Sequence, residues 1–366
     1  MKTKVKIVDL FAGVGGLSYA FAQDLDFEII AANEILPNMA KAYKLNHPSV
    51  KVYCKDIVQF GLNDLNKDFS ISKGSIDIVI GGPPCQAYST VGKRLIDDPR
   101  GKLFQEYFRI LKELDPSIFI FENVKGLISM GDGFLLPTII DLFSTLGYTT
   151  QFKTLNAADY GAPQMRERVI IVGSKRGIKY KFPNQTHGIN ADLFNNKTSP
   201  HLTLKEALSD LPLNPNEDVN FYMTEPQNEF QKLMRMNASD KITEHTVPKN
   251  NPTLIKIMEL LPEGGTPKDL PIDIRPSSGF GNSYSRLWWN RPSTTLTRNF
   301  STPSSARCIH PLVARPLSTR EGARIQGFPD NYIFCGSRSE KNLQIGNAVS
   351  PFLSKALLSS IKKCIF

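Results

Sequence analysis

The side chain best suited to covalent chemistry is a cysteine that follows a stiff turn. The apolar run 75–80 predicts a short buried strand, and Gly81-Gly82-Pro83-Pro84 then ends it. Cys85 comes next, at the predicted carboxyl end of the strand, where open α/β sheets bind ligands. A nucleophilic thiol needs such a fixed, partly exposed position. A lone cysteine is more often a small buried residue, so the turn alone leaves both interpretations open.

A second glycine turn precedes a predicted helix near the start of the chain. The apolar strand 5–10 leads into Phe11-Ala12-Gly13-Val14-Gly15-Gly16 and then into a helical stretch over 17–25. Strand, glycine turn and helix form a nucleotide-binding layout, because glycines admit a ligand close to the backbone. The spacing is not G-x-G-x-x-G, so the turn is weak evidence for a phosphate site.

Carboxylates end two further predicted strands. Glu34 follows the strand 27–33, about 20 residues beyond the glycines, where a ribose would be hydrogen-bonded. Asp56 follows the strand 51–54 and would either accept from an adenine amino group or cap a helix before Ile57. Acidic or glycine-rich strand ends thus recur at 9, 34, 56 and 81 with helical segments between them, which predicts βαβ units and a parallel sheet.

Two later stretches carry groups suited to acid–base chemistry and anion binding. The apolar strand 116–121 ends in Glu122-Asn123-Val124, and a partly desolvated carboxyl there should have a raised pKa and suit a proton donor. A capping carboxylate is the alternative. Gln164, Arg166 and Arg168 alternate along an extended segment, so we expect them on one face, where guanidinium groups would bind a phosphate or a base edge. A charged face on an edge strand is the other interpretation.

The bulk composition limits the class of protein. The chain of 366 residues carries a formal charge of +9, which suits a polyanionic partner without establishing one. Its five cysteines show no paired spacing, which favours a reducing compartment and argues against disulfides or a zinc site. No apolar stretch resembles a signal sequence or reaches membrane-spanning length, so we expect a cytoplasmic protein that does not associate with a membrane.

The composition also predicts two kinds of region. Residues 184–285 are rich in Asn, Pro and Thr, and we expect only two helices there, at 203–211 and 226–236. Basic and aromatic residues interleave over 275–299, which fits nucleic acid or a core with a basic rim. Towards the end we predict an N-capped helix from Ser318 to Gln326, a loop over 344–349 and a helix over 351–362.

Together these stretches resemble the C5-cytosine DNA methyltransferase family. Six segments match it in order and spacing, and they cover the chain except about 180–285: 9–16, 82–86, 122–124, 164–168, 315–329 and 344–349. The resemblance implies an α/β, Rossmann-like S-adenosylmethionine-dependent methyltransferase fold with a smaller, irregular target-recognition domain. It implies a catalytic domain over 1–183, target recognition over 184–300 and a return to the catalytic domain over 301–366.

The resemblance also implies roles for particular residues. Cys85 would be the nucleophile, Glu122 would bind and protonate cytosine N3, and Arg168, with Arg166, would hold the same base. The residues implied to bind S-adenosylmethionine, and S-adenosylhomocysteine as product, are Phe11, Gly13, Val14, Gly15, Gly16, Glu34, Ile35, Asp56, Ile57, Pro83, Asn347, Ala348 and Val349. Those implied to contact DNA are Gln86, Ser89, Lys93, Arg94, Arg100 and Asn123, most of them in a loop over 87–102 that closes on DNA.

The implied activity is a DNA (cytosine-5-)-methyltransferase that acts on a flipped-out cytosine of double-stranded DNA through a covalent intermediate. We expect a monomer, with a cognate restriction endonuclease as a functional partner. The alternatives are a tRNA methyltransferase on the same scaffold and an inactive nucleic-acid-binding relative. A nicotinamide dehydrogenase lacks its G-x-G-x-x-G here, and a zinc deaminase lacks its P-C-x-x-C.

Overall fold

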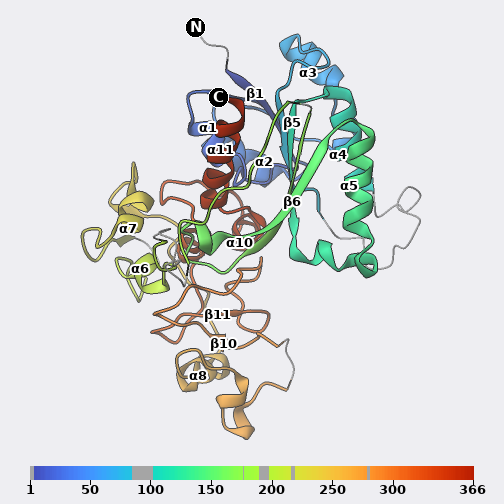
Figure 1. The fold of residues 1–366 in the computed structure, drawn as a ribbon. Helices are drawn as coiled ribbons and strands as arrows, with labels where there is room; N and C mark the ends of the chain where they lie inside the picture. Colours follow the sequence, from blue (N-terminus) through green and yellow to red (C-terminus); the bar gives the residue numbers. More distant parts are fainter. Residues whose placement is uncertain (1–3, 85–101, 176, 189–197, 216–218, 278–280) are drawn as a thin grey trace. The chain divides into compact units, whose positions relative to one another are not determined.

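The computed structural model describes residues 4–84, 102–175, 177–188, 198–215, 219–277 and 281–366. The chain forms two compact units (Figure 1). Unit 1 comprises residues 1–156, 167–184 and 353–366, and unit 2 comprises 157–166 and 185–352. Residues 301–352, which the sequence prediction placed with the catalytic domain, therefore lie in unit 2.

Unit 1 is built on a seven-stranded sheet in the order β3-β2-β1-β4-β5-β7-β6. The strands are β1 (Val5–Leu10), β2 (Phe27–Asn33), β3 (Lys51–Tyr53), β4 (Ile78–Gly81), β5 (Ile118–Val124), β6 (Thr149–Asn156) and β7 (Glu167–Ser174). Strands β1 to β5 pair in parallel, whereas β7 runs antiparallel to both β5 and β6. The α/β class is confirmed, and so is the parallel pairing predicted for the strands that end near 9, 34, 56 and 81. The direction of β7 was not predicted. The connection 157–166 contains no α-helix to carry the chain back across the sheet, so β7 returns antiparallel beside β6.

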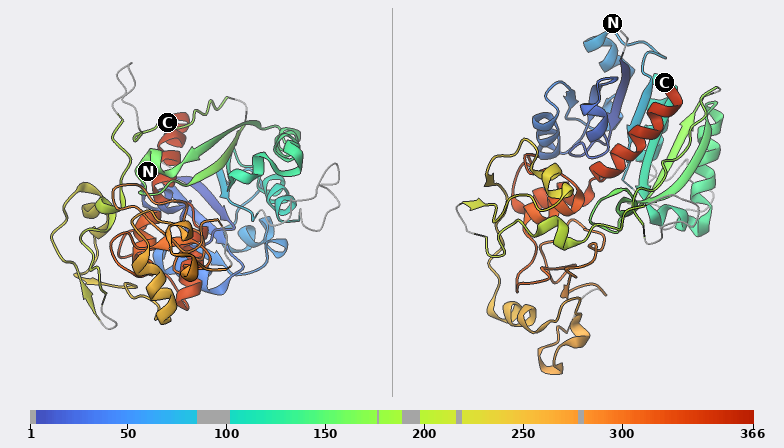
Figure 2. Two further views of the ribbon diagram at one scale, coloured as in Figure 1. Left: turned by 90° about the horizontal axis from the view of Figure 1, so that it is seen from below. Right: turned by 60° about the vertical axis from the view of Figure 1, so that its left-hand side comes forward.

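Helices cover both faces of this sheet (Figures 1 and 2). They are α1 (Tyr19–Gln23), α2 (Pro37–Asn46), α3 (Leu62–Phe69), α4 (Lys102–Leu114), α5 (Leu135–Thr145) and, from Leu353 onward, α11 (Pro351–Ile365). Short 3-10 helices are η1 (Ile57–Gln59), η3 (Lys125–Ile128) and η4 (Met130–Gly133). Helix α11 is fixed to α1, because Ser354 accepts the Ala20 N–H and Lys362 pairs with Asp24.

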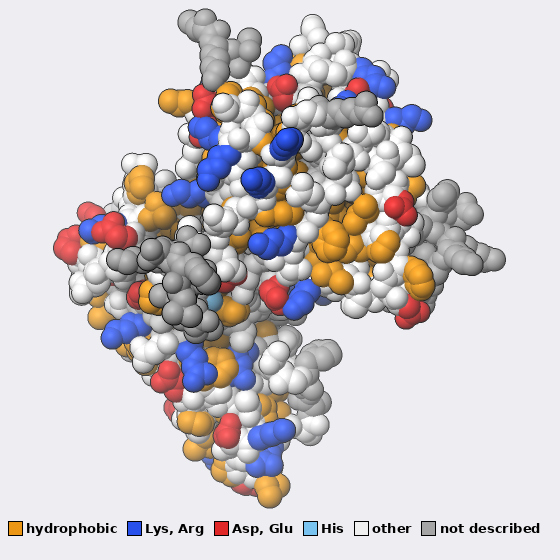
Figure 3. All heavy atoms as spheres, in the orientation of Figure 1, with side chains coloured by type: hydrophobic (Ala, Val, Ile, Leu, Met, Phe, Trp, Pro, Cys, Tyr) orange, Lys and Arg blue, Asp and Glu red, His pale blue; other side chains and the backbone are white. Residues whose placement is uncertain are grey.

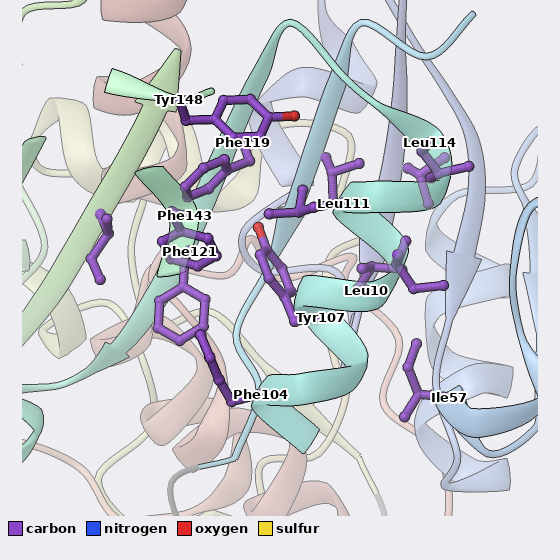
Figure 4. Packing of buried hydrophobic residues seen from close by; sticks show 14 of the residues in the cluster. Leu10, Ile57, Phe104, Tyr107, Leu111, Leu114, Phe119, Phe121, Phe143 and Tyr148 are labelled. Carbon is purple, nitrogen blue, oxygen red and sulfur yellow. The ribbon is translucent and has the colours of Figure 1, made fainter. Parts of the chain in front are cut away.

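An aromatic cluster under α4 and α5 fixes β5 in place (Figure 4). The Phe119 and Phe143 ring centroids are 4.3 Å apart, and Tyr107 and Phe121 meet edge to face at 5.2 Å. The buried Tyr107 hydroxyl donates to the Ile120 carbonyl at 3.0 Å. These contacts immobilise β5, the strand that carries Glu122.

Unit 2 contains shorter elements. Its helices are η5 (Ala157–Tyr160), α6 (Leu204–Leu208), α7 (Glu229–Arg235), α8 (Pro252–Leu260), η6 (Pro267–Asp269), η7 (Ile272–Ile274), α9 (Thr319–Gln326) and α10 (Arg338–Asn347). Two-stranded sheets form from β8 (Asn220–Phe221) with β9 (Lys241–Ile242), and from β10 (Ser285–Arg286) with β11 (Arg307–Ile309).

Two predictions for this unit are wrong and one is confirmed. Helix α8 is a third helix in the region where we expected two. Gln344 to Asn347 are helical rather than a loop, because the Ser337 cap starts a helix that continues to Asn347. The predicted helix after Ser318 is confirmed, with Glu321 completing its capping box and Gly327 ending it in a left-handed conformation.

A buried ionic network connects the elements of unit 2. Arg324 of α9 is fully buried and binds Asp330 at 2.7 Å. The same guanidinium pairs with Asp210 and donates to the Ala207 carbonyl of α6 at 2.9 Å. Each buried charge has a partner, so the network is not destabilising. Its bonds from Arg324 to Ala207 and Asp210 hold α6 against α9. Within the described part of the chain, no helix is long and apolar enough to cross a membrane.

We predict that Gly173→Ala destabilises unit 1. A Cβ at Gly173 would lie 1.9 Å from the Phe119 ring, which sits opposite it on β5. The ring is held by the aromatic cluster, so we expect a loss of about 1–3 kcal/mol of unfolding free energy. Chemical denaturation measures this loss.

Gly126→Ala is the matched control, because a Cβ there meets its nearest atom at an ordinary 3.6 Å. Its unfolding free energy should change by less than about 0.5 kcal/mol. Equal effects of the two substitutions would contradict the packing described here.

Candidate active site

The glycine turn after β1 adopts a backbone that few residues tolerate. Phe11 has φ +53°, Gly13 +57° and Gly15 +90°, all in the left-handed region. The turn is held by hydrogen bonds from the Ala12 N–H to the Asn33 carbonyl and from the Gly15 N–H to the Ala12 carbonyl, at 3.0 and 2.9 Å. A strained Phe11 at this position persists only where the surroundings fix it, as they do at binding sites.

Glu34 lies beside this turn, at the end of β2. One carboxylate oxygen accepts the Gly13 N–H and the other accepts the Leu36 N–H, each at 2.8 Å. Burial raises the pKa of Glu34, against these backbone hydrogen bonds, which lower it. A carboxylate has about four acceptor positions, so Glu34 can still accept from two further hydroxyl groups, as a ribose would offer.

The space around the turn differs from one glycine to the next. A Cβ at Gly13 would meet nothing within 4 Å, whereas one at Gly15 would lie 2.4 Å from His47. Val14 is buried, and Ile35 is 56% exposed. The turn is therefore packed on one side and open at Gly13, which fits a ligand lying against the backbone there.

The predicted adenine residues lie at the next strand end. Asp56 caps η1 by accepting the Val58 N–H through one oxygen at 3.0 Å. The Ile57 side chain is buried in the core, and Val58 is 59% exposed.

A carboxylate and a guanidinium meet at the carboxyl end of β5. Glu122 Oε1 lies 2.9 Å from Arg168 Nε, and each side chain is only 11% exposed. Arg168 also donates to the Glu167 carbonyl at 2.8 Å, which fixes its guanidinium. This pair places a hydrogen-bonding acid and a cation at one point of unit 1.

The turn that precedes Cys85 packs directly on this pair. A Cβ at Gly82 would lie 2.6 Å from Glu122 Oε2, so only glycine allows the turn to come so close. The buried Asn123 amide donates to the Pro83 carbonyl at 3.0 Å. Several predicted residues, Cys85 among them, lie outside the described residues: Cys85, Gln86, Ser89, Lys93, Arg94 and Arg100.

The predicted face of Gln164, Arg166 and Arg168 is wrong. Gln164 and Arg166 are fully buried in unit 2. Gln164 accepts the Leu296 N–H and donates to Gln326, each at 2.7 Å. Arg166 donates to the carbonyls of Leu296, Gly346 and Ala348 at 2.8, 2.7 and 3.0 Å, so its guanidinium binds backbone rather than joining a cluster with Arg168.

Arg166 thereby fixes the segment that contains Asn347, Ala348 and Val349. Gln326 also donates to the Ala348 carbonyl. Gly346 approaches the backbone of 297–298 so closely that a Cβ would lie 2.5 Å from the Arg298 nitrogen. Asn347 is exposed on this rigid segment, while Val349 is buried. Sequence reasoning missed this role of Arg166, because its partners are 130 and 180 residues away in the chain.

No group of three or more His, Cys, Asp or Glu side chains suited to a metal ion lies in the described part of the chain. Sequence reasoning also missed Tyr43 and His47, which pack against Gly15. Their only signal was their position between the predicted strands 27–33 and 51–54, where we expected a helical segment.

Comparison with known proteins identifies the family. The family model of the C-5 cytosine-specific DNA methylase matches residues 5–363. The chain is 32% identical to the Type II methyltransferase M.AgeI of Thalassovita gelatinovora, over 99% of this chain and all of that one. It is 35% identical to the Type II methyltransferase M.Eco47II of Escherichia coli, over 97% of this chain and 78% of that one.

Solved structures agree on the fold. A crystal structure titled as a DNA modification methyltransferase of an E. coli prophage matches with a TM-score of 0.76 and 25% identity, over 99% of both chains. The Dnmt2 structure of Spodoptera frugiperda matches at 0.62 and 18% identity, over 98% of this chain and 99% of that one, and bears on the fold alone.

The match over nearly the whole chain excludes a dehydrogenase or a zinc deaminase. Methylation in this family depends on S-adenosylmethionine and takes DNA as substrate. The chain belongs to the C-5 cytosine-specific DNA methylase family and is a DNA (cytosine-5-)-methyltransferase of the Type II restriction-modification kind.

Proposed function

We propose that Cys85 attacks C6 of a cytosine in double-stranded DNA while Glu122 and Arg168 bind the opposite edge of the same ring. The observation that carries this proposal is the Glu122–Arg168 pair, which lies against Gly82, three residues before Cys85 in the sequence.

The nucleophile answers a chemical difficulty. C5 of cytosine is a poor nucleophile, and addition of a thiolate to C6 turns the ring into an enamine whose C5 can attack a methyl group. Covalent catalysis thus divides one difficult step into easier ones. After transfer the C5 proton leaves to water or hydroxide, and the Cys85 thiolate is released.

Glu122 and Arg168 stabilise the charge that the addition creates. Electron density moves to the N3 and O2 edge of the ring when sulfur adds to C6. Glu122 presents a proton to N3, and the Arg168 guanidinium lies near O2. The ion pair with Arg168 favours the charged carboxylate in the free enzyme, so Glu122 acquires the proton for N3 from solvent when DNA binds. Arg166 has no part in this step, because its guanidinium binds the carbonyls of Gly346 and Ala348 within unit 2.

The turn after β1 would hold S-adenosylmethionine, which supplies an electrophilic methyl group when bound and leaves as S-adenosylhomocysteine. The open space at Gly13 and the remaining acceptor positions of Glu34 fit this ligand. Phe11 and 13–16 bind its methionine part and Glu34 its ribose. The groups proposed for the adenine and for closing the pocket are Ile35, Asp56, Ile57, Pro83, Asn347, Ala348 and Val349.

The proposed DNA contacts rest on the need to flip the target base out of the duplex, and not on a charged surface patch. Figure 3 shows Lys and Arg as well as acidic side chains on the face drawn, and this face alone does not locate the DNA. The target carbon is buried in a stacked duplex, and the base must be flipped out. We propose that the loop 87–102 closes on the DNA and that residues 184–300 recognise its sequence. We also propose that the enzyme is monomeric and cytoplasmic, and that a restriction endonuclease is its functional partner.

We predict that Cys85→Ser abolishes methyl transfer. A serine hydroxyl is a far weaker nucleophile at neutral pH, and loss of a nucleophile typically costs at least about 1,000-fold in rate. Transfer of radiolabelled methyl groups to plasmid DNA measures the rate, and sequencing of 5-methylcytosine gives the recognition site. The exposed Cys54 supplies the control Cys54→Ser, which should retain full activity. Equal rates for the two variants would overturn the assignment of Cys85.

We predict that Glu122→Gln lowers kcat by about 100- to 10,000-fold, because the amide keeps the shape but cannot provide the proton. Affinity for S-adenosylmethionine should stay unchanged. The exposed Glu167, which pairs with Lys125 of η3, supplies the control Glu167→Gln. A Glu122→Gln enzyme with wild-type kcat would contradict the acid role.

We predict that Gly13→Ala and Glu34→Gln each weaken S-adenosylmethionine binding by about 10-fold or more, since one fills the open space in a left-handed position and the other removes a charged acceptor. Calorimetric titration measures this affinity, and fluorescence anisotropy with duplex DNA should remain unchanged. Unaltered affinity in both variants would refute the location of the pocket.

A further inference from the structure

Four polar side chains that the proposed mechanism does not use lie behind the glycine turn. Asp9 of β1, Ser18, Tyr43 of α2 and His47 are all at least 95% buried, from 0% to 5% exposed. Buried polar groups are costly unless they hydrogen-bond, so their partners show what they hold.

Their contacts form a chain that ends on the backbone of the turn. The Tyr43 hydroxyl donates to Asp9 Oδ2 at 3.2 Å and lies 3.0 Å from the Ser18 hydroxyl. Ser18 also lies within 3.4 Å of the Gly15 carbonyl, as a donor. His47 hydrogen-bonds the Gly15 backbone and packs its ring on Tyr43, with centroids 4.6 Å apart.

The same side chains fill the space under Gly15. A Cβ on Gly15 would lie 2.4 Å from His47 Nε2 and 3.1 Å from the Tyr43 ring. Gly15 therefore cannot shift toward α2, and its φ of +90° is fixed from behind. At Gly13, two residues earlier, an added Cβ would meet no atom within 4 Å. The network thus braces the closed side of the turn and leaves the ligand side free.

We propose that Asp9, Ser18, Tyr43 and His47 are positioning residues that set the affinity for the methyl donor by fixing the conformation of the turn 11–16, without touching the ligand. This inference rests on the proposed location of S-adenosylmethionine at that turn.

The ionisation of Asp9 should make the effect of the network on ligand affinity depend on pH. Burial raises the pKa of Asp9 to about 7, against the hydrogen bonds from Ser18 and Tyr43. The other titratable groups near it are Glu34, whose pKa is also raised by burial, His47, with a pKa lowered to about 4, and Tyr107, with a raised pKa. Between pH 6 and 8, His47 and Tyr107 stay neutral. Glu34 serves the ligand itself, so the Asp9→Asn variant isolates the Asp9 contribution.

Affinity and stability should then change in opposite directions with pH. Ionised Asp9 accepts from the Tyr43 hydroxyl, whereas the protonated form gives up an acceptor position, so affinity should rise as pH rises through about 7. Asp9 has a folded-state pKa above its unfolded value of 3.8, so its contribution to stability is lost as pH rises from about 4 to about 7. A merely structural role would make affinity follow stability.

The test compares Tyr43→Phe and Ser18→Ala with Tyr148→Phe in the full-length protein. Tyr148, labelled in Figure 4, is another buried tyrosine, and its hydroxyl donates to the Pro116 carbonyl at 2.7 Å. It directly precedes β6, the edge strand of the sheet farthest from β3. We expect Tyr43→Phe and Ser18→Ala each to weaken S-adenosylmethionine binding by about 3- to 10-fold, the range for loss of one hydrogen bond. KM for S-adenosylmethionine should rise while kcat and DNA affinity stay within about twofold, and Tyr148→Phe should lower only the melting temperature.

Asp9→Asn should reduce the pH dependence of S-adenosylmethionine affinity between pH 6 and 8.

The outcomes separate this inference from the proposed function. If Gly13→Ala weakens binding but Tyr43→Phe and Ser18→Ala bind as Tyr148→Phe does, the network has no positioning role. If Asp9→Asn keeps the wild-type pH dependence of S-adenosylmethionine affinity, Asp9 has no positioning role in the network. If Gly13→Ala also binds normally, the pocket itself is misplaced and the proposed function fails.

Discussion

The structure depends on a buried ion pair at the carboxyl end of the sheet. Glu122 and Arg168 are each 11% exposed and 2.9 Å apart, so each charge compensates the other where little water reaches them. Removing one partner of such a pair costs about 3–5 kcal/mol, because the remaining charge is left buried. The pair also explains the direction of β7. Arg168 is the second residue of its strand, and only an antiparallel strand brings its beginning to the edge where β5 ends.

Close backbone approach completes this edge. Gly82 lies where a single added carbon would strike the Glu122 carboxylate, and Asn123 binds the Pro83 carbonyl. The turn before Cys85 is therefore positioned by the same strand end that presents the acid. On the other side of β4, strand β1 leads into the turn 11–16, whose left-handed residues are held by Asn33 and Glu34. Two neighbouring parallel strands thus present the turn before Cys85, the proposed nucleophile, and the proposed cofactor turn at one edge of unit 1.

The sequence predicted the features that depend on short-range pattern. Apolar runs that end in Gly, Asp or Glu marked β1, β2, β4 and β5, and the Ser318 cap marked α9. It could not predict features that depend on distant partners. Alternation placed Arg166 and Arg168 on one face, but Arg166 turns to the carbonyls of Gly346 and Ala348, which no local pattern announces. The antiparallel β7 was missed for the same reason, since strand direction is set by pairing and not by composition.

The most direct test of the central claim is to trap the covalent bond. A duplex that contains the methylation site with 5-fluorocytosine as the target base should form a stable adduct, because fluorine at C5 cannot leave as the proton does. With S-adenosylmethionine present, mass spectrometry of the digested complex should find the modified nucleotide on the peptide that contains Cys85. An enzyme that methylates normal DNA but gives no adduct, or an adduct on another residue, would contradict the account.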